Sequence, residues 1–312
     1  MKLLITGATG LVGAEIVKLA LAKNHTIHFL TTSKSKIVNK ENYKGFYWNP
    51  AKAEIDTNCL NGIEAILNLA GASISKRWTK DYKNEILESR INSVQLLHKT
   101  LSENTHQVKH FCSASALGIY PSSFTKKYDE TVTDVNPTFL GKVVHKWEQE
   151  VDKLSSLDIQ VSKLRIGIVL SKNGGALTQM LKPIKLGFGA AIASGKQFQS
   201  WIHIKDLARL FLFVVEQNLS GSYNAVATNP VTNLEMTKAI ATRLKKPLWL
   251  PNIPTFMMKL LLGEMSDLVL ESQYLKNDKI KNEGFEFEFE TVEETLANVI
   301  TRNVNSSAVE NK

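Results

Sequence analysis

The chain has 312 residues, of which 43% are hydrophobic and 22% charged, a composition typical of a globular protein with one large domain or a large domain and a smaller partner. Its formal net charge is +8, but the basic residues are dispersed and mostly lysine. Because base and phosphate recognition favour arginine, we expect a lysine-rich solvated surface and no nucleic-acid partner.

Two further classes of protein are disfavoured. The longest apolar runs, such as Leu207–Val215 and Phe256–Leu262, fall short of the ~20 residues that a membrane-spanning helix needs, so no membrane association is expected. Cys59 and Cys112 form neither a disulfide framework nor a metal-binding pattern. We therefore predict no metal site, and two buried thiols in a reducing cytoplasm.

The first half of the chain alternates short apolar runs with helical patterns. Strands are predicted at Lys2–Thr6, Thr26–Thr31, Ala65–Leu69, Lys109–Ser113 and Ile159–Leu170, and helices at Leu11–Lys23, Lys80–Asn104 and Phe139–Leu154. This alternation predicts an α/β fold in which a doubly wound parallel sheet is covered by helices on both faces.

The pattern changes after Leu170. Five glycines between Gly174 and Gly195 indicate loops around a ligand or a substrate lid, and a helix predicted at Ile204–Glu216 returns to the core. From Pro230 onward the pattern is helical and interrupted by prolines. We predict a main domain over 1–170, with 200–228 returning to it, a smaller C-terminal substrate subdomain over 171–199 and 229–301, and a frayed tail over 302–312.

Three glycines follow the first predicted strand. Gly7, Gly10 and Gly13 have the GxxGxxG spacing, in which the first permits a tight turn, the second a close approach to a pyrophosphate and the third close helix packing. The free N–H groups of Leu11 and Val12, at the start of the helix, would face the phosphates. Within the βαβ pattern, this turn predicts an NAD(P)-binding Rossmann domain.

The end of the second predicted strand indicates which dinucleotide is bound. NAD-binding proteins usually carry an acidic residue there for the ribose 2′-hydroxyl, whereas this chain has Thr32, Ser33 and Lys34. Hydroxyls and a lysine can accept a 2′-phosphate, so NADP is favoured and NAD is the alternative. In that alternative the loop is solvated, and Thr32 or Ser33 holds the 2′-hydroxyl.

Several segments match, in order, those of one family. They are the glycine turn, Asn68–Gly71, Lys76–Thr79, Glu88–Arg90, Ser113–Tyr120, Arg165–Leu170, Gly174–Leu177, Ser200–Ile204 and Leu262–Met265. With them the chain resembles the extended short-chain dehydrogenase/reductases and, more narrowly, the YfcH-like group of NAD(P)-dependent epimerase-like proteins. The resemblance implies an NAD(P)-dependent oxidoreductase or epimerase acting on a small polar molecule, with anionic or nucleotide-linked substrates included.

The resemblance also implies roles for individual residues. Members use a Ser or Thr after the fifth strand to bind the reacting oxygen. Ser115 fits this role, and Ser113 is the second candidate. Ser113, Ala70 and Gly71 are also predicted to contact the cofactor. Members also use a Tyr-x-x-x-Lys pair on the next helix, and Lys142 fits the lysine that holds the nicotinamide ribose.

The tyrosine of that pair is missing. The residue four positions before Lys142 is Thr138, which is a poor proton donor near neutral pH. Tyr120 could supply the phenol from another direction, or a substrate group or water could supply the proton. Equally, Tyr120 could be a packing residue in a non-catalytic NADP-binding sensor, and these alternatives stay open, as does a homodimer.

Five residues are candidates for substrate contact. Arg165 lies at the end of a strand that runs into the apolar segment Ile166–Leu170. A charge buried there needs an anion, either on the substrate or on an internal Asp or Glu. Arg77 and Trp78 follow the Ala70-Gly71 turn and could line the same cleft. Trp201 and His203 precede the helix that returns to the core, where family members often place lid contacts. For His203 a structural hydrogen bond is the favoured role.

Overall fold

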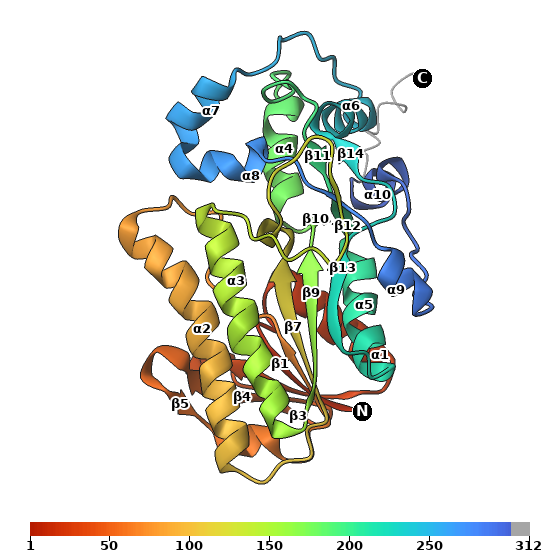
Figure 1. The fold of residues 1–312 in the computed structure, drawn as a ribbon. Coiled ribbons are helices and arrows are strands. Elements are labelled where there is room, and N and C mark those ends of the chain that lie inside the picture. The colour runs from red at the N-terminus through yellow and green to blue at the C-terminus, as the bar shows by residue number, and fades with distance from the viewer. Residues whose placement is uncertain (301–312) are drawn as a thin grey trace, which may run out of the picture.

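A twisted, mostly parallel sheet runs through the computed structural model, which describes residues 1–300 (Figure 1). The strands lie in the order β13-β9-β7-β6-β1-β2-β4-β3, with β5 beside β4. Their bounds are β1 Lys2–Thr6, β2 Thr26–Thr31, β3 Asn39–Lys40, β4 Tyr43–Asn49, β5 Glu54–Ile55, β6 Ala65–Asn68, β7 His110–Ala116, β9 Gln160–Ile166 and β13 Gly221–Ala225. Since β1 pairs with both β2 and β6, the strand order reverses beside β1, which is where open α/β sheets bind their ligands.

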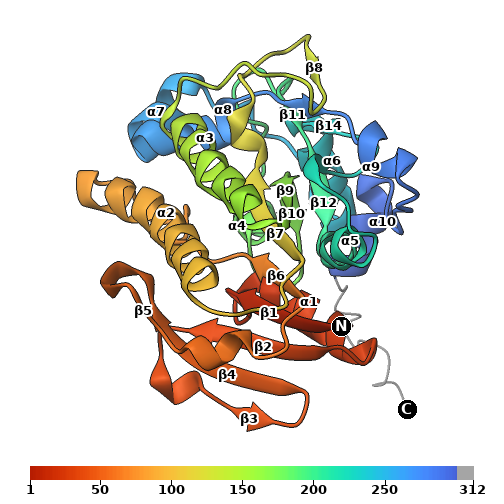
Figure 2. The same cartoon turned by 60° about the horizontal axis from the view of Figure 1, so that its bottom comes forward.

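Helices cover both faces of the sheet (Figures 1 and 2). Helices α1 (Leu11–Ala22) and α5 (Ile204–Glu216) pack together on one face, while α2 (Lys80–Glu103) and α3 (Phe139–Asp152) pack together on the other. The central strands β1 and β6 are almost wholly buried, as expected of parallel strands between two helical layers. The predicted Rossmann-type α/β fold is confirmed.

The C-terminal half builds a smaller layer beyond the carboxyl ends of the strands (Figure 1). It contains α4 Ala176–Lys185, α6 Asn233–Leu244, α7 Thr255–Leu262, α8 Asp267–Leu270 and α10 Val292–Val299, while α9 Asp278–Asn282 packs beside β13. The short strands β8 Lys127–Tyr128, β10 Ile168–Leu170, β11 Phe198–Gln199, β12 Trp201–His203, β14 Val231–Thr232 and β15 Tyr274–Leu275 form three two-stranded pairs. A second hydrophobic cluster, centred on Trp201, Met236 and Leu296, supports this layer.

Two predicted segments differ from the structure. The strand expected over Ile159–Leu170 breaks at Gly167, after which β10 leaves the sheet and pairs with β12. Glycine is needed at the break because a Cβ atom there would lie 2.4 Å from the carbonyl oxygen of Ser200. The glycine-rich stretch contains helix α4 and is not loop throughout.

The predicted division into a main domain and a C-terminal subdomain stays a prediction. Ile280 and Phe285, from the predicted subdomain, pack into the main core cluster. The predicted frayed tail over 302–312 lies outside the described residues.

Candidate functional site

The turn after β1 needs glycine at two positions for the fold itself. Gly7 has a left-handed φ of +70°, and a Cβ atom there would lie 3.0 Å from the carbonyl carbon of Leu69. A Cβ atom on Gly13 would lie 2.2 Å from the carbonyl oxygen of Gly7. A Cβ atom on Gly10 would meet only that same oxygen, at 3.2 Å. Gly10 therefore borders open space at the switch point of the sheet.

The start of α1 offers unpaired donors beside that space. Gly10 is the N-cap residue and has no side chain to cap the helix. The first intrahelical bond is donated by Ala14 to the carbonyl oxygen of Gly10, which leaves the N–H groups of Leu11 and Val12 without intrahelical partners. Together with the helix dipole, these donors favour an anionic group.

A row of polar side chains joins the ends of three strands. The Thr6 hydroxyl donates to Asn68 Oδ1 at 2.8 Å and accepts from the backbone N–H groups of Leu69 and Ala70, both at 3.0 Å. Asn68 Nδ2 in turn donates to Ser113 Oγ at 3.1 Å. These bonds connect the carboxyl ends of β1, β6 and β7, at the same edge of the sheet as the glycine turn.

The end of β2 is polar and cationic. The Ser33 N–H donates to Thr31 Oγ1 at 3.2 Å, and the Ser33 and Ser35 hydroxyls are hydrogen-bonded at 2.8 Å. Lys34 begins a short 3₁₀ turn (Lys34–Lys36), and its ammonium group lies 5.1 Å from the ring centre of Tyr47. Thr32 and Lys34 are exposed, so both can reach a ligand lying over β2.

Ser115 is held by a buried ion pair. Its hydroxyl donates to Glu148 Oε1 at 2.5 Å. The same carboxylate accepts two hydrogen bonds from Arg165, at 3.0 Å from Nε and 2.9 Å from Nη2. Burial would raise the pKa of Glu148, but the hydrogen bonds and charge of Arg165 outweigh it and hold the pKa below its ordinary value. Of the two alternatives for Arg165, the structure shows the internal carboxylate.

Tyr120 belongs to the same buried network. Its hydroxyl accepts from Arg165 Nη1 and donates to Asn224 Oδ1, both at 2.8 Å, and its ring stacks on Tyr128 at 5.2 Å. Burial raises the pKa of Tyr120 to about 12. A phenol that is fully buried, already paired and this weakly acidic favours the packing role that the sequence left open.

Lys142 is not brought to Ser115. It is exposed on α3. Because Lys142 lies six residues before Glu148, its side chain points about 120° around the helix axis from that of Glu148. One turn before Glu148 on the same face stands the buried Val144, and one turn earlier Leu140. Thr138 is the N-cap residue of α3, and its hydroxyl accepts from the Gly141 N–H at 3.5 Å. The α3 face beside Ser115 thus carries no phenol–ammonium pair.

Trp201 and His203 serve the second cluster and the start of α5. Trp201 is buried, and its indole N–H donates to the carbonyl oxygen of Asn229 at 3.0 Å. His203 Nδ1 accepts from the Lys205 N–H at 3.0 Å, and its Nε2 lies 3.2 Å from Asn298 Oδ1. Burial lowers the pKa of His203 to about 4, so the ring is neutral. These contacts match the structural role favoured for His203.

Arg77 and Trp78 lie past the end of β6, before α2. Arg77 is exposed, and Trp78 is half-buried, with its indole N–H donating to the carbonyl oxygen of Ile74 at 2.9 Å. The Trp78 ring meets Phe139 edge-on at 5.3 Å, which ties this loop to the start of α3. Both residues stay predicted substrate contacts.

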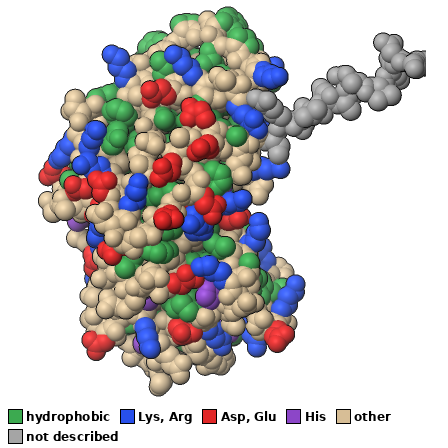
Figure 3. All heavy atoms as spheres, turned by 90° about the vertical axis from the view of Figure 1, so that its right-hand side faces the viewer, with side chains coloured by type: hydrophobic (Ala, Val, Ile, Leu, Met, Phe, Trp, Pro, Cys, Tyr) green, Lys and Arg blue, Asp and Glu red, His purple; other side chains and the backbone are tan. Residues whose placement is uncertain are grey.

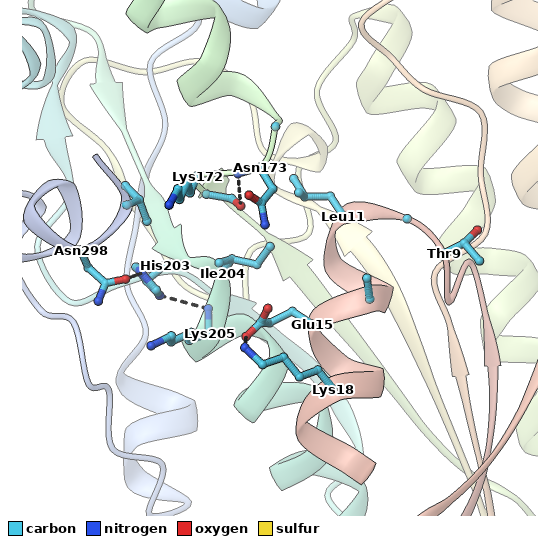
Figure 4. Close-up of a pocket in the computed structure, with 15 residues that line it drawn as sticks. Thr9, Leu11, Glu15, Lys18, Lys172, Asn173, His203, Ile204, Lys205 and Asn298 are labelled. Atoms are coloured by element: carbon cyan, nitrogen blue, oxygen red, sulfur yellow. Dashed lines mark hydrogen bonds and ion pairs between the residues drawn. The ribbon is translucent and has the colours of Figure 1, made fainter. Parts of the chain in front are cut away.

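A groove of about 700 Å³ opens beside the glycine turn (Figure 4). It lies between α1, α5, α10 and the loop after β10, and its lining includes Gly10, Leu11, Lys172, His203 and Lys205. Ser115 does not line it. The groove therefore borders the outer side of the turn and not the Ser115 network.

Sequence reasoning missed the residues that support the site from behind. Glu148 and Asn224 complete the Ser115 and Tyr120 network. Ser89 accepts from the Ala72 N–H at 2.9 Å, and Arg90 donates to the Ala72 carbonyl oxygen at 3.2 Å, so α2 anchors the turn after β6. An acid on the apolar face of a helix is the one signal that could have identified Glu148.

Residues 1–300 offer neither a cluster of metal ligands nor a membrane-spanning helix. No group of three or more His, Cys, Asp or Glu residues in that range could hold a metal ion. No helix in the same range is long and apolar enough to cross a membrane. Cys59 and Cys112 are both buried and unbridged.

The sheet, its switch point and the glycine turn define a Rossmann-type nucleotide-binding protein. The chain belongs to the NAD dependent epimerase/dehydratase family, whose profile matches residues 3–226. A second profile, a domain of unknown function (DUF1731), matches residues 253–299. The predicted resemblance to extended short-chain dehydrogenase/reductases is confirmed.

Relatives match over nearly the whole chain. The chloroplastic homolog of epimerase family protein SDR39U1 from Arabidopsis thaliana is 37% identical over 302 residues, which cover 95% of this chain and 86% of the relative. An epimerase family protein of Staphylococcus aureus is 34% identical over 302 residues, covering 96% of this chain and 99% of the relative.

Solved structures agree with these matches. Human epimerase family protein SDR39U1 (isoform 2), solved with NADPH, superposes with a TM-score of 0.82 at 26% identity, covering 96% of this chain and 99% of that one. The nucleoside-diphosphate sugar epimerase of Corynebacterium glutamicum has a TM-score of 0.76 at 26% identity, covering 95% of this chain and 57% of that one.

Proposed function

We propose that the chain binds NADP across the carboxyl edge of its sheet and transfers hydride between this cofactor and a hydroxyl or carbonyl carbon of a small polar substrate. The observation that carries the proposal is the open side of Gly10 beside the uncapped start of α1, directly at the switch point. Rossmann proteins place a dinucleotide pyrophosphate at this position.

The residues present fit NADP better than NAD. The N–H groups of Leu11 and Val12 would bind the pyrophosphate, and Ser33 and Lys34 would bind the 2′-phosphate. The human neighbour was solved with NADPH, whereas several less similar neighbours were solved with NAD. NADP, when bound, supplies the hydride donor or acceptor at its nicotinamide ring.

Ser115 would contact the reacting oxygen of the substrate. Its single hydroxyl proton is directed to Glu148, which leaves the lone pairs of Oγ to accept a hydrogen bond from a substrate hydroxyl. Glu148 stays ionised at neutral pH because Arg165 lowers its pKa, so it orients the serine and is a weak proton acceptor. This arrangement suits a hydroxyl-bearing substrate such as a sugar, and nucleotide-linked sugars are the substrate class we propose to test first.

A second candidate function is NADP binding without turnover. Two observations favour it: the α3 face beside Ser115 is apolar at Leu140 and Val144, and the Tyr120 hydroxyl is already paired on both sides. A protein with this site could report the NADP state of the cell to a partner.

Calorimetry with NADPH and NADH tests the cofactor proposal. We expect NADPH to bind more tightly, and Lys34→Glu to lower NADPH affinity about tenfold while leaving NADH affinity nearly unchanged, because the carboxylate repels only the 2′-phosphate. Lys238→Glu makes the same charge change on the exposed surface of α6 and serves as the control. Equal affinities for the two cofactors, or equal losses in both variants, would contradict the proposal.

A hydride-transfer assay with nucleotide sugars and simple carbonyls separates the two functions. For an enzyme, Ser115→Ala should lower turnover by about 10²–10⁴ with unchanged NADPH affinity, whereas Tyr120→Phe should leave turnover within a fewfold. Loss of turnover in folded Tyr120→Phe would show that the phenol is the proton donor after all. Tight NADPH binding without turnover on any substrate of the panel would favour the sensor.

A further inference from the structure

A set of exposed apolar side chains lies on α7 and on the segments after α4 and before α7, in the layer that Figure 1 shows beyond the carboxyl ends of the strands. We call it the α4–α7 face and define it by Leu186, Phe188, Trp249, Phe256, Leu260 and Leu261. On α7, Phe256, Leu260 and Leu261 are 70%, 83% and 72% exposed, and Met258 is the one buried residue of that helix. Single exposed leucines are common in monomeric proteins, but three large exposed apolar side chains on one eight-residue helix mark an interaction site.

The parts of this face are held together. The Trp249 indole donates to the carbonyl oxygen of Gly187 at 3.1 Å, which fixes the segment before α7 against the end of α4. A β-bridge between Ile192 and Ile253 attaches the same segment to the loop that follows α4. The apolar side chains are therefore presented by an ordered scaffold.

The segments that build the face carry mainly basic side chains. No Asp or Glu occurs in residues 159–205 or 236–263, which supply α4, the segment before α7 and α7 itself. The exposed lysines of the face are Lys182, Lys185, Lys245, Lys246 and Lys259. Figure 3 views the molecule from the side opposite α7, where hydrophobic, basic and acidic side chains all appear at this end. Two acidic residues follow α7: Glu264 pairs with Lys83 at 2.6 Å, and Asp267 lies close enough to Lys259 to interact with its charge.

We propose that the α4–α7 face docks on the surface of an anionic phospholipid bilayer. Exposed Trp, Phe and Leu side chains surrounded by lysines are the chemistry of proteins that lie in the membrane interface, where the apolar groups enter the headgroup region and the lysines meet lipid phosphates. Helix α7 has eight residues, so it lies on the bilayer and does not cross it. The proposal departs, for this one face, from the sequence-based expectation of a solvated lysine surface without membrane contact.

Two other occupants fit less well. A second copy of the chain would bring two sets of five lysines together, with only Glu264 and Asp267 of each copy to offset them, which like-charge repulsion disfavours. Nucleic acid would attract the lysines but would leave the exposed leucines of α7 in water, because phosphate and base contacts need polar or planar groups.

Vesicle flotation tests the proposal with the full chain. Vesicles of phosphatidylcholine with about one third phosphatidylglycerol should bind the protein at low salt, pure phosphatidylcholine vesicles much less, and added salt should weaken the binding. Lys245→Gln and Lys246→Gln should each lower the partition coefficient about fivefold. Lys109→Gln and Lys146→Gln, which remove exposed lysines from the main domain, should change it little.

The double variant Leu260→Glu, Leu261→Glu addresses the apolar part of the face. It should abolish vesicle binding while NADPH affinity stays at the wild-type value, which shows that the chain is folded. Absence of binding to anionic vesicles, or equal losses in the control lysine variants, overturns the proposal. So does a wild-type dimer, measured by sedimentation velocity, that the double variant converts to a monomer, because the face then serves self-association.

Discussion

Glu148 is the residue that links the Ser115 hydroxyl to the buried charge of Arg165. Both side chains are buried, and the pair bonds in a two-pronged geometry at 2.9 and 3.0 Å. Removing one partner of such a pair leaves the other charge buried and uncompensated, which is far more costly than the net gain from forming the pair. The Ser115 hydroxyl depends on the same carboxylate for its orientation.

We expect Glu148→Gln to lower the free energy of unfolding at neutral pH by about 3–5 kcal/mol, because the amide leaves Arg165 without a counter-charge. The pKa of Glu148 is lowered in the folded state, so its stabilising contribution is present above the ordinary pKa of about 4.5 and is lost as pH falls through the lowered value. Urea titrations from pH 3 to pH 7 should therefore show a decline at acid pH in the wild type that is reduced in the variant.

Asp152→Asn is the matched control for Glu148→Gln. Asp152 pairs with Lys163 at 2.5 Å, but its side chain is 57% exposed, so its loss should cost no more than about 1 kcal/mol. Equal effects of the two substitutions would show that the Glu148–Arg165 pair contributes no more than a surface ion pair.

At the scale of elements, the turn into α1 contains one glycine that the fold requires, Gly13, and one that we expect cofactor binding to require, Gly10. Gly13→Ala should destabilise the protein by several kcal/mol, because its Cβ atom would lie 2.2 Å from the backbone oxygen of Gly7. Gly10→Ala meets only that oxygen at 3.2 Å and should keep the fold, while its methyl group obstructs the pyrophosphate and lowers NADPH affinity at least tenfold. Thermal melts and calorimetry on both variants measure the two effects, and unchanged NADPH affinity in Gly10→Ala would make the turn purely structural.

The start of α3 gives a second test at this scale. Thr138→Tyr recreates the Tyr-x-x-x-Lys spacing with Lys142, yet Thr138 caps α3 and Lys142 is exposed on a different side of the helix from Glu148. We expect a loss of about 1 kcal/mol from the missing cap, comparable to that in Thr138→Ala, and no new turnover. A gain of hydride transfer in Thr138→Tyr would mean that α3 presents this pair to the substrate in solution.

The elements also show what the sequence could predict. Strand β1, strand β2 and helix α5 begin and end where apolar runs and helical periodicity placed them. The β4 strand was missed because it is half-buried and lacks a clear alternation, and α4 because glycines flank it.

In the site, the glycine spacing identified the turn because its physical requirement is local. Lys142 was placed by counting residues, but which side of α3 it faces depends on how the helix packs. The Arg165–Glu148 pair joins elements 17 residues apart, and the Tyr120–Asn224 bond joins elements 104 residues apart. Since such contacts arise only after the sheet has formed, the sequence could indicate that Arg165 needs an anion and that Glu148 is an acid on an apolar helix face, but not that the two residues pair.

For the whole molecule, Asp206 fastens the C-terminal chain to the main core. It is buried in the first turn of α5 and accepts from the backbone N–H groups of Glu288 and Phe289, both at 3.0 Å. The Phe289 ring stacks on His203 at 3.7 Å, and Phe285 packs beside Phe213 in the main cluster. One carboxylate thus joins the segment before α10 to the helix that returns to the sheet.

We expect Asp206→Ala to lower the free energy of unfolding by about 2–6 kcal/mol, because two part-buried backbone N–H groups lose their acceptor and each unpaired donor costs about 1–3 kcal/mol. The loss should be uneven across the molecule. Amide hydrogen exchange should accelerate at Glu288 and Phe289, where the acceptor is removed, and should change less in β1 and β6, which open only with the whole fold. Glu290→Gln, which removes only the exposed pair with Lys281 at 3.7 Å, is the control and should change the free energy of unfolding by less than about 1 kcal/mol. If the amides of Glu288 and Phe289 exchange at the wild-type rate in Asp206→Ala, the segment is held by its aromatic contacts, and Asp206 is not the fastening residue.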